Sequence, residues 1–436
     1  ASIWDEFCKR KNKIQNNHKG DHACDFFYQY KNDIQLLKQL GIPNFRFSIS
    51  WPRVIPFGEG FINHKGISFY DRLVDECLEN DITPWITLYH WDLPHALELK
   101  GGWTNRDIIS WFNNYTEVVA KKLGDRVKNW MVLNEPVVFT GAGYYLGVHA
   151  PGRKGESNYF PALHHTAICQ AQGIKTLKEN VKDAHVGTTF SCSHISPNNP
   201  NNENDIIASN KVDALINRLF VEPLLGYGYP IHDLPFLSRL EKYMLPGDNK
   251  LIKACPDFIG VQNYTREVVK HNFLQPVLKA KIIDAKSRNV DRTVMNWEIY
   301  PESLYEMIKK FNSYRHISEI YVTENGAAFK DEVLPDGEVN DVRRVEYLKS
   351  YVQQLLRAKE EGMKVNGYFV WSLLDNFEWS EGYAPRFGIV HVNYKNQKRT
   401  IKSSGYWYSE FIRQYKEAEK QKQTLQEAMS VSEEEY

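Results

Sequence analysis

Several features that define particular classes of protein are missing from this sequence. No stretch approaches the roughly 20 consecutive apolar residues that a membrane-spanning helix needs. Neither sign of charge dominates, because 54 basic side chains are balanced by 54 acidic ones and the formal net charge is zero. A chain of zero net charge is not expected to bind nucleic acid or an anionic membrane as its main function.

Cysteine is scarce, with six residues in a chain of 436. The six show no CxxC pair and no spacing typical of metal ligands, so neither a disulfide framework nor a metal site is predicted. We expect them to be small buried hydrophobic residues in a reducing compartment. No signal peptide is visible, which also favours a cytoplasmic location. The residues are Cys8, Cys24, Cys77, Cys169, Cys192 and Cys255.

The chain also lacks a linker rich in proline, glycine or serine, which predicts one domain over residues 1–415. Short apolar runs typical of buried strands alternate with amphipathic runs of helical length, and this alternation indicates an α/β fold with a parallel sheet. The predicted strands are residues 44–51, 83–91, 128–136, 184–193, 257–264, 319–326 and 365–376. The clearest predicted helices are residues 25–40, 67–80, 106–123 and 342–361.

The ends of the chain and three long connections stand outside this alternation. Residues 1–20 are polar and are predicted to form a loop. Residues 416–436 are rich in glutamate, glutamine and lysine, and we expect a solvated, partly disordered tail. Residues 134–159, 195–205 and 227–250 are predicted long loops. In a barrel, long loops after strands build the face that carries the active site.

Two glutamates directly follow predicted buried strands. Glu135 comes after the run WMVLN and before a proline, and Glu324 comes after IYVT and before an asparagine. A charge at the carboxyl end of a barrel strand is costly, and catalysis is the usual reason for placing one there. Two such carboxyl groups predict the pair that cleaves glycosidic bonds.

Polar and aromatic residues mark the same end of six predicted strands. A single arginine or histidine in a strand is usually an ion-pair partner or a hydrogen-bonded core residue. Packing alone would place valine, isoleucine or leucine at these positions. The combination of polar and aromatic residues there therefore predicts a functional site. Besides the two glutamates, the residues are Arg46, His90, Trp91, Asn134, Gln262, Tyr264, Trp371, Glu378 and Trp379.

These motifs together resemble glycoside hydrolase family 1, the retaining β-glucosidase family. The resemblance covers the chain from Ala1 to about Arg413 and implies a (β/α)₈ TIM barrel. The strand that comes first in the family would lie upstream of Ala1, so seven of eight strands are expected here. The matching segments, in family order, are 44–53 (NFRFSISWPR), 87–94 (TLYHWDLP), 101–105 (GGWTN), 132–136 (VLNEP), 257–266 (DFIGVQNYTR), 297–301 (WEIYP), 322–326 (VTENG) and 371–379 (WSLLDNFEW).

The resemblance implies a role for each matching residue. Glu135 corresponds to the general acid/base and Glu324 to the nucleophile, with Arg46 and Tyr264 holding the nucleophile. Asn134 corresponds to a ligand of the sugar 2-hydroxyl, and Trp297 to a wall of the aglycone site. Gln262 stands where the family commonly has asparagine. The other implied substrate-binding residues are His90, Trp91, Trp371, Glu378 and Trp379.

The predicted function is that of a hydrolase without metal or organic cofactor. It is a retaining β-glycosidase, preferentially a β-glucosidase, that removes terminal non-reducing glucosyl residues from small β-glucosides or cello-oligosaccharides. An acidic Glu378 disfavours a sugar phosphate. Two alternatives stay open, a β-galactosidase or β-fucosidase of the same family and a catalytically impaired sugar-binding protein. The second would follow from a barrel that lacks its first strand and exposes two sheet edges.

Overall fold

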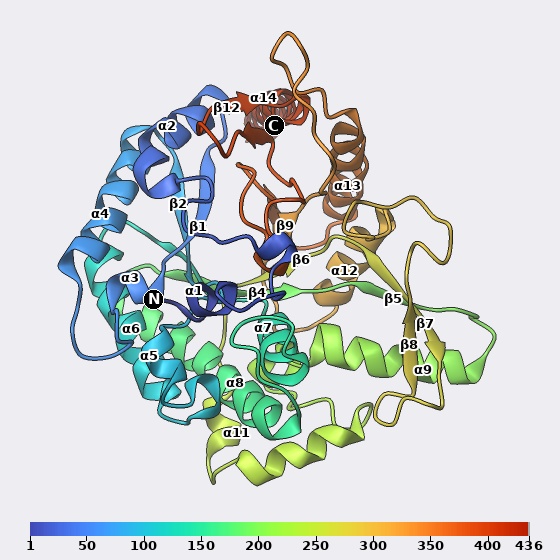
Figure 1. Cartoon of the computed structure of the whole chain (residues 1–436). Coiled ribbons are helices and arrows are strands. Elements are labelled where there is room, and N and C mark those ends of the chain that lie inside the picture. The colour runs from blue at the N-terminus through green and yellow to red at the C-terminus, as the bar shows by residue number, and fades with distance from the viewer. Residues whose placement is uncertain (435–436) are drawn as a thin grey trace.

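The computed structural model describes residues 1–434, and the side chains of residues 1–424. Seven parallel strands form the central sheet, and helices surround it (Figure 1). All seven predicted strands are confirmed, each somewhat shorter than expected. In spatial order they are β1 (Asn44–Ser48), β2 (Thr83–Tyr89), β3 (Asn129–Asn134), β4 (His185–Ser191), β6 (Phe258–Gln262), β9 (Ile320–Asn325) and β10 (Val365–Val370).

Amphipathic helices form the outer layer and cover the sheet. In α4 (His64–Glu79), for example, Ile67, Tyr70, Leu73 and Val74 are buried, at the three- and four-residue intervals of one helical face. The four helices predicted most clearly are confirmed as α2 (Phe26–Gln39), α4, α6 (Ile108–Leu123) and α13 (Val342–Glu360). Further helices are α8 (Glu156–Asn180), α12 (Glu302–Asn312) and α14 (Ser403–Glu434).

The curved sheet closes almost completely into a barrel. Each strand is hydrogen-bonded to its neighbours in the spatial order, but β1 and β10 stand at the two ends of that order. Within residues 1–434 no strand joins them. The expectation of seven strands therefore agrees with the structure, and the opening lies between β1 and β10.

Both ends of the chain differ from their predictions. Residues 1–20 include α1 (Ile3–Cys8), whose N-cap Ser2 forms a capping box with Asp5 and whose Trp4 and Phe7 are buried. A helix of six residues is too short for a periodic pattern, so the prediction of a loop was wrong there. At the other end α14 continues to Glu434, because glutamate, glutamine and lysine are good helix formers. Residues 435–436 of the predicted tail lie outside the described residues.

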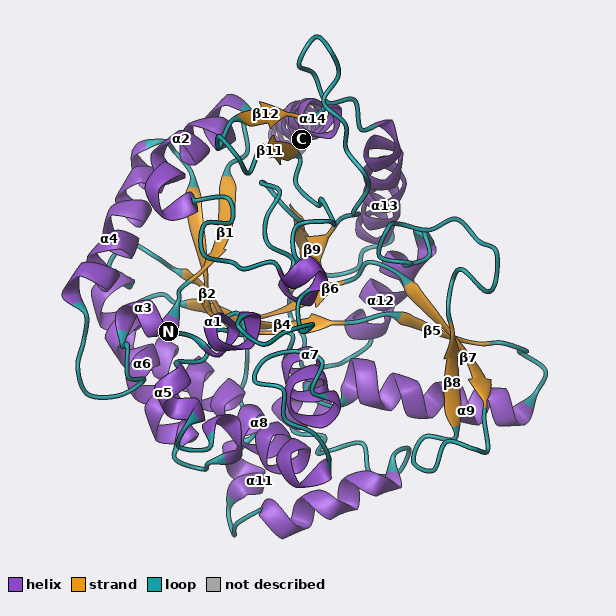
Figure 2. Cartoon of the chain, in the orientation of Figure 1, coloured by secondary structure: helices purple, strands orange, loops and turns teal. Residues whose placement is uncertain are grey.

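The predicted long loops contain short elements that the sequence pattern did not reveal. Residues 134–159 include α7 (Pro136–Thr140) and a π-helical turn (Gly141–Leu146), and residues 227–250 include a 3₁₀ helix (Pro235–Tyr243) and α11 (Asp248–Leu251). Outside the barrel, Figure 2 shows a small sheet beside α9 (Glu203–Asp213). Its strands are β5 (His194–Pro197), β7 (Arg266–His271) and β8 (Ala280–Ile283).

The cysteines are all free thiols, and four of the six are buried as expected. Cys24 is half-buried and Cys255 is exposed, so the expectation of burial was wrong for Cys255. No helix within the described part of the chain is long and apolar enough to cross a membrane. The same residues contain no cluster of histidine, cysteine, aspartate or glutamate with the geometry of a metal site.

Candidate active site

Glu324 is the last residue but one of β9, and its carboxylate is held on both oxygens. Arg46 Nη1 from β1 donates to Oε1 at 2.6 Å, and the Tyr264 hydroxyl donates to Oε2 at 2.6 Å. The side chain is only about 5% exposed. A cation and a phenol hydrogen bond both favour the ionised form of a carboxyl group. Burial, followed by the charge of Glu324, raises the pKa of Tyr264 well above its usual value, so the phenol keeps its proton.

Glu135 follows β3 directly and is also buried. Its backbone has a φ of 48°, in the left-handed region that side chains rarely adopt, and its N–H donates to the Thr189 carbonyl at 3.0 Å. Strained backbone of this kind is typical of functional sites. Pro136 then begins α7, so the chain turns sharply away and leaves the carboxyl group at the mouth of the barrel.

The two carboxyl groups have different electrostatic surroundings. Burial first, and then the negative charge of Glu324, raise the pKa of Glu135 well above the usual value of a glutamate. Glu324 has Arg46 as a direct ion-pair partner, and Glu135 forms no ion pair with the described residues. One carboxylic acid beside one carboxylate is the arrangement that acid and base catalysis requires.

Asn134 lies at the centre of the hydrogen-bond network that joins the strands. Its Oδ1 accepts from Arg46 Nη2, from Gln262 Nε2 at 2.8 Å and from Thr189 Oγ1 at 3.2 Å. Its Nδ2 lies 3.1 Å from His90 Nε2. Gln262 is fully buried behind Asn134. Gln262 thus donates to Asn134 from a position without solvent exposure.

Aromatic side chains form a second wall of the site. The His90 ring lies 5.9 Å from the Trp371 ring and 6.0 Å from the Trp379 ring, centroid to centroid. Trp91 packs at 5.3 Å from Trp379, and its Nε1 donates to the Asn134 carbonyl at 2.9 Å. Trp297 lies 5.1 Å from Tyr264, on the nucleophile's side. The predicted site residues thus come together from strands far apart in the sequence.

His90 and Glu378 both have shifted pKa values. Burial, and then the charge of Arg46, lower the pKa of His90 well below its usual value, so the ring is neutral at pH 7. Burial, and then the charges of Glu324 and Glu381, raise the pKa of Glu378 to about 8. Neutral His90 and protonated Glu378 can both donate to and accept from sugar hydroxyl groups.

Sequence reasoning missed several residues that support this wall. Trp4 from α1 packs at 4.5 Å from Trp379 and at 5.4 Å from His149. Asp375, between Trp371 and Glu378, is buried and accepts from Arg386 and Lys402. The motif WSLLDNFEW contained Asp375, but its partners follow it by 11 and 27 residues, and no spacing rule connects them.

Taken together, the fold and the site define the class of this protein: an α/β-barrel hydrolase whose paired carboxyl groups are those of a glycosidase. The chain belongs to glycosyl hydrolase family 1, whose family model matches residues 1–417. This membership confirms the predicted barrel fold and the predicted class of O-glycoside hydrolase.

Individual relatives match the chain over nearly its whole length. β-Glucosidase A of Thermotoga maritima is 44% identical, over 94% of this chain and 92% of the relative. A 1,4-β-D-glucan glucohydrolase of Thermotoga neapolitana is 43% identical over the same shares. The structure of the family 1 β-glucosidase from Thermotoga maritima superimposes with a TM-score of 0.91 at 43% identity, over 94% of this chain and 92% of that one. A complex of the same enzyme with deoxynojirimycin also reaches 0.91.

Proposed function

We propose that this protein is a retaining β-glucosidase that removes terminal non-reducing β-D-glucosyl residues from small β-glucosides or cello-oligosaccharides. The observation that carries the proposal is the contrast between Glu324, held by Arg46 and Tyr264, and Glu135, buried beside that charge. The names of the relatives, β-glucosidase and glucan glucohydrolase, support a glucosyl substrate over a galactosyl or fucosyl one.

In the first step the sugar is transferred to the enzyme. A carboxylate oxygen of Glu324 attacks the anomeric carbon and forms a covalent bond to it, while Glu135 donates its proton to the glycosidic oxygen. The bond between the anomeric carbon and that oxygen breaks, and the aglycone leaves as an alcohol. Ionised Glu324 and protonated Glu135 are the forms that the surrounding groups favour.

In the second step water releases the sugar. Once Glu324 is esterified its negative charge is gone, and with it one of the causes that raise the pKa of Glu135. The Glu135 carboxylate can then take a proton from water, whose oxygen attacks the anomeric carbon and displaces Glu324. Two inversions give net retention of configuration, and both side chains return to their starting forms.

The polar and aromatic walls supply the sugar contacts. Because Arg46, Gln262 and Thr189 saturate Asn134 Oδ1, its Nδ2 is the group we assign to the sugar 2-hydroxyl. We assign the binding of the glycone hydroxyls to His90, Glu378 and Trp379. Trp371 is proposed to stack on the sugar ring, and Trp297, beside Tyr264, to border the aglycone.

Two further parts of the proposal concern the whole chain. We infer that residues 1–415 act as a single catalytic domain, because the site draws on β1 and β10 at opposite ends of the sheet order. Six free thiols and no disulfide among the described residues support a cytoplasmic location, where thiols stay reduced.

The test is to trap the covalent intermediate. A 2-deoxy-2-fluoro-β-glucoside with a good leaving group slows the second step, so the protein should gain the mass of one fluorosugar, located on the peptide that contains Glu324. The control is Glu324→Gln, which should gain nothing. No mass gain, or a label on another residue, would overturn the assignment.

A further inference from the structure

Four aromatic rings at the mouth of the barrel pack on one another in a closed cycle. The Trp4 ring lies 4.5 Å from the Trp379 ring and 5.4 Å from the His149 ring, centroid to centroid. The Trp91 ring completes the cycle, at 5.3 Å from Trp379 and 5.7 Å from His149. We call these four residues the ring cluster. Trp379 is assigned to the glycone in the proposed function, whereas Trp4 and His149 have no role there.

The two tryptophans that follow barrel strands have strained backbones. The φ of Trp91 is 81° and that of Trp379 is 47°, both in the left-handed region that residues other than glycine rarely adopt. Such a conformation persists only where its surroundings hold it. The Trp91 indole donates to the Asn134 carbonyl at 2.9 Å, but that of Trp379 makes no hydrogen bond with any described residue. The orientation of Trp379 therefore depends on the rings that pack against it.

Helix α1 carries Trp4 and is bonded to two of the loops that form the ring cluster. Trp4 is only 5% exposed. The Ile3 N–H donates to the Leu93 carbonyl at 2.8 Å, in the loop after β2. Arg10, just beyond the helix, donates from Nη1 to the Pro151 carbonyl at 2.9 Å, in the loop after β3. Both acceptors lie two residues after a member of the ring cluster, so α1 fixes Trp4 relative to both loops.

His149 is uncharged within the ring cluster. Burial lowers its pKa to about 4, so the ring is neutral at pH 7 and brings no uncompensated charge among the indoles. Its Nε2 lies 3.3 Å from the Oγ of Ser380, the residue that follows Trp379. His149 therefore joins Trp4 and Trp91 to the loop that carries Trp379.

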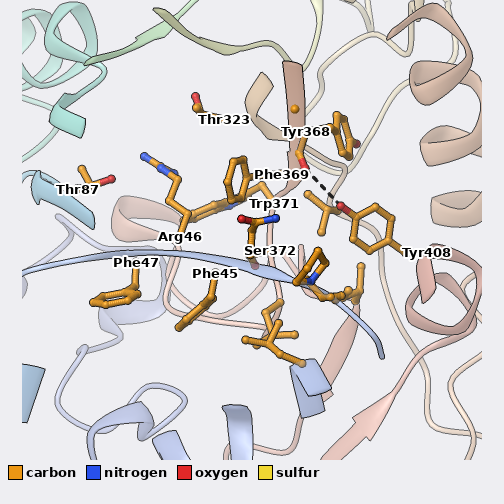
Figure 3. Close-up of a pocket in the computed structure, with 18 of the residues that line it drawn as sticks. Phe45, Arg46, Phe47, Thr87, Thr323, Tyr368, Phe369, Trp371, Ser372 and Tyr408 are labelled. Atoms are coloured by element: carbon orange, nitrogen blue, oxygen red, sulfur yellow. Dashed lines mark hydrogen bonds between the residues drawn. The ribbon is translucent and has the colours of Figure 1, made fainter. Parts of the chain in front are cut away.

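Trp371, which is proposed to stack on the sugar ring, has different neighbours. It borders the cavity of about 650 Å³ between β1 and β10 that Figure 3 shows, together with Arg46 and Ser372. None of the four residues of the ring cluster lines this cavity. Loss of Trp4 should therefore disturb Trp379 and leave the stacking residue in place.

We propose that Trp4 and His149 are positioning residues that fix Trp379 against the glycone and so determine how strictly the protein selects its sugar. Neither is proposed to touch the sugar. A site distinguishes a hydroxyl group from its epimer by a hydrogen-bonding group held in one place, so a Trp379 that is free to move should discriminate less. This role deepens the proposed function and rests on it. Glu135 and Glu324 lie outside the ring cluster, so the bond-breaking step should change little.

The first test replaces Trp4 by alanine. For an aryl β-glucoside, KM should rise about tenfold while kcat changes little. The preference for the glucoside over the matching galactoside, as a ratio of kcat/KM values, should fall several-fold. Calorimetric titration with deoxynojirimycin, a basic analogue of glucose, should show about tenfold weaker binding and needs no turnover.

Two further variants separate positioning from stability. Trp4→Phe keeps a ring against Trp379 and loses an indole N–H that has no partner among the described residues, so it should retain most of the binding and the selectivity. Trp111→Ala removes a tryptophan of α6 that is 8% exposed and lies outside the ring cluster. It should lower the free energy of unfolding and leave KM and selectivity unchanged.

His149→Ala tests the second positioning residue, and it takes the place of Trp4→Ala if that variant does not fold. It should also weaken the binding of deoxynojirimycin. Because both residues act through Trp379, the double variant should lose less than the sum of the two single losses. Fluorine NMR of protein labelled with 5-fluorotryptophan reports on the ring cluster without any ligand. The resonance of Trp379, assigned with Trp379→Phe, should shift in Trp4→Ala and stay in place in Trp111→Ala.

Unchanged affinity and selectivity in both alanine variants would overturn the proposal, and so would a loss confined to kcat. If Trp4→Phe is as impaired as Trp4→Ala, the indole N–H acts and ring packing does not. Additive losses would mean that Trp4 and His149 do not act through one residue. A parent protein without glycosidase activity would count against the proposed function, while the fluorine resonance of Trp379 would still judge the ring cluster.

Discussion

The two walls of the proposed active site are held in different ways. In the strand wall, formed by Glu135, Asn134 and Glu324, hydrogen bonds between side chains of non-adjacent strands hold Asn134 and Glu324 across the inside of the barrel. The loop wall, residues 371–388, lies beyond the end of β10, where the backbone of residues 372–375 is hydrogen-bonded to residues 387–390 and no longer to β9. Buried charges hold this wall from behind. The proposed catalytic residues are thus held by the strands of the sheet, whereas the loop that carries the proposed sugar-binding residues is held by an ion network.

That network is almost entirely buried. Asp375 accepts from Arg386 Nη1 at 2.5 Å, Lys402 Nζ at 2.7 Å and the Gly388 backbone N–H at 3.1 Å. Lys402 also pairs with Asp331, which accepts from Arg344 at 3.0 Å. Removing one partner of a buried ion pair leaves an uncompensated charge, so such a network fixes geometry strictly. Four predictions test the division between the two walls.

The largest effect is expected at the nucleophile. Glu324→Ala should lower kcat by about 10⁴-fold or more, because no covalent intermediate can form. Azide should restore turnover partly and give the glycosyl azide of inverted configuration, as measured by NMR of the product. Glu319→Gln, just before the opposite end of the same strand, is the control and should retain nearly full activity. Near-normal turnover by Glu324→Ala would contradict the assignment of the strand wall.

Removing the acid should have a smaller effect that depends on the leaving group. Glu135→Gln cannot donate a proton, so kcat/KM for cellobiose should fall by about 10²- to 10⁴-fold. A dinitrophenyl glucoside leaves without protonation, and its first step should be nearly unchanged in stopped-flow measurements. An equal loss for both substrates would mean that Glu135 positions the sugar and transfers no proton.

Lys402→Met breaks the ion network behind the loop wall. It leaves Asp331 and Asp375 without one buried partner, so the free energy of unfolding should fall by about 3–5 kcal/mol. Chemical denaturation measures this loss, with the exposed Lys122→Met as a control at about 0–1 kcal/mol. If the ion network holds only the loop wall, KM should rise several-fold while kcat changes little. A loss confined to kcat would show that the network serves the strand wall.

The smallest effect is expected at Glu378. Its pKa in the folded protein is raised to about 8, so the folded state binds the proton more tightly than the unfolded one. The free energy of unfolding should therefore decline as the pH rises from about 4.5 towards 8. Glu378→Gln should remove this part of the decline and raise KM several-fold. Denaturation curves from pH 5 to 9 test this, with exposed Glu332→Gln as the control; an unchanged pH dependence would refute the raised pKa.

The sequence predicted the barrel strands well because each is a short, strongly apolar run. β6, for example, is buried along its entire length and is bounded by polar residues. Helix α1 and the small sheet of β5, β7 and β8 were missed. Their elements are short, and they depend on contacts with distant segments, such as the Ile3 N–H that donates to the Leu93 carbonyl at 2.8 Å. Local periodicity carries no signal for such contacts.

The residues of the candidate site also divide into those that local sequence pattern selects and those that only the structure explains. Asn134, Glu135 and Glu324 follow apolar runs, so position in the sequence was enough to select them. Gln262 was also selected, but only the structure reveals that it is fully buried and hydrogen-bonded to Asn134. Trp4 contacts Trp379 and Lys402 contacts Asp375, both more than 25 positions away in the sequence. Neither Trp4 nor Lys402 belongs to a motif, so the sequence did not indicate them.

The sequence by itself determined the strands, the helical layer and the two glutamates, since apolar periodicity and residue type are local properties. The family resemblance already implied that Arg46 and Tyr264 hold Glu324. Only the tertiary structure decided that Glu135 keeps its proton and that buried charges hold the loop wall. It also decided that β1 and β10 stand at the two ends of the sheet order. All of these depend on distance and burial between segments remote in sequence, and the energies of charges and hydrogen bonds are set by those two quantities.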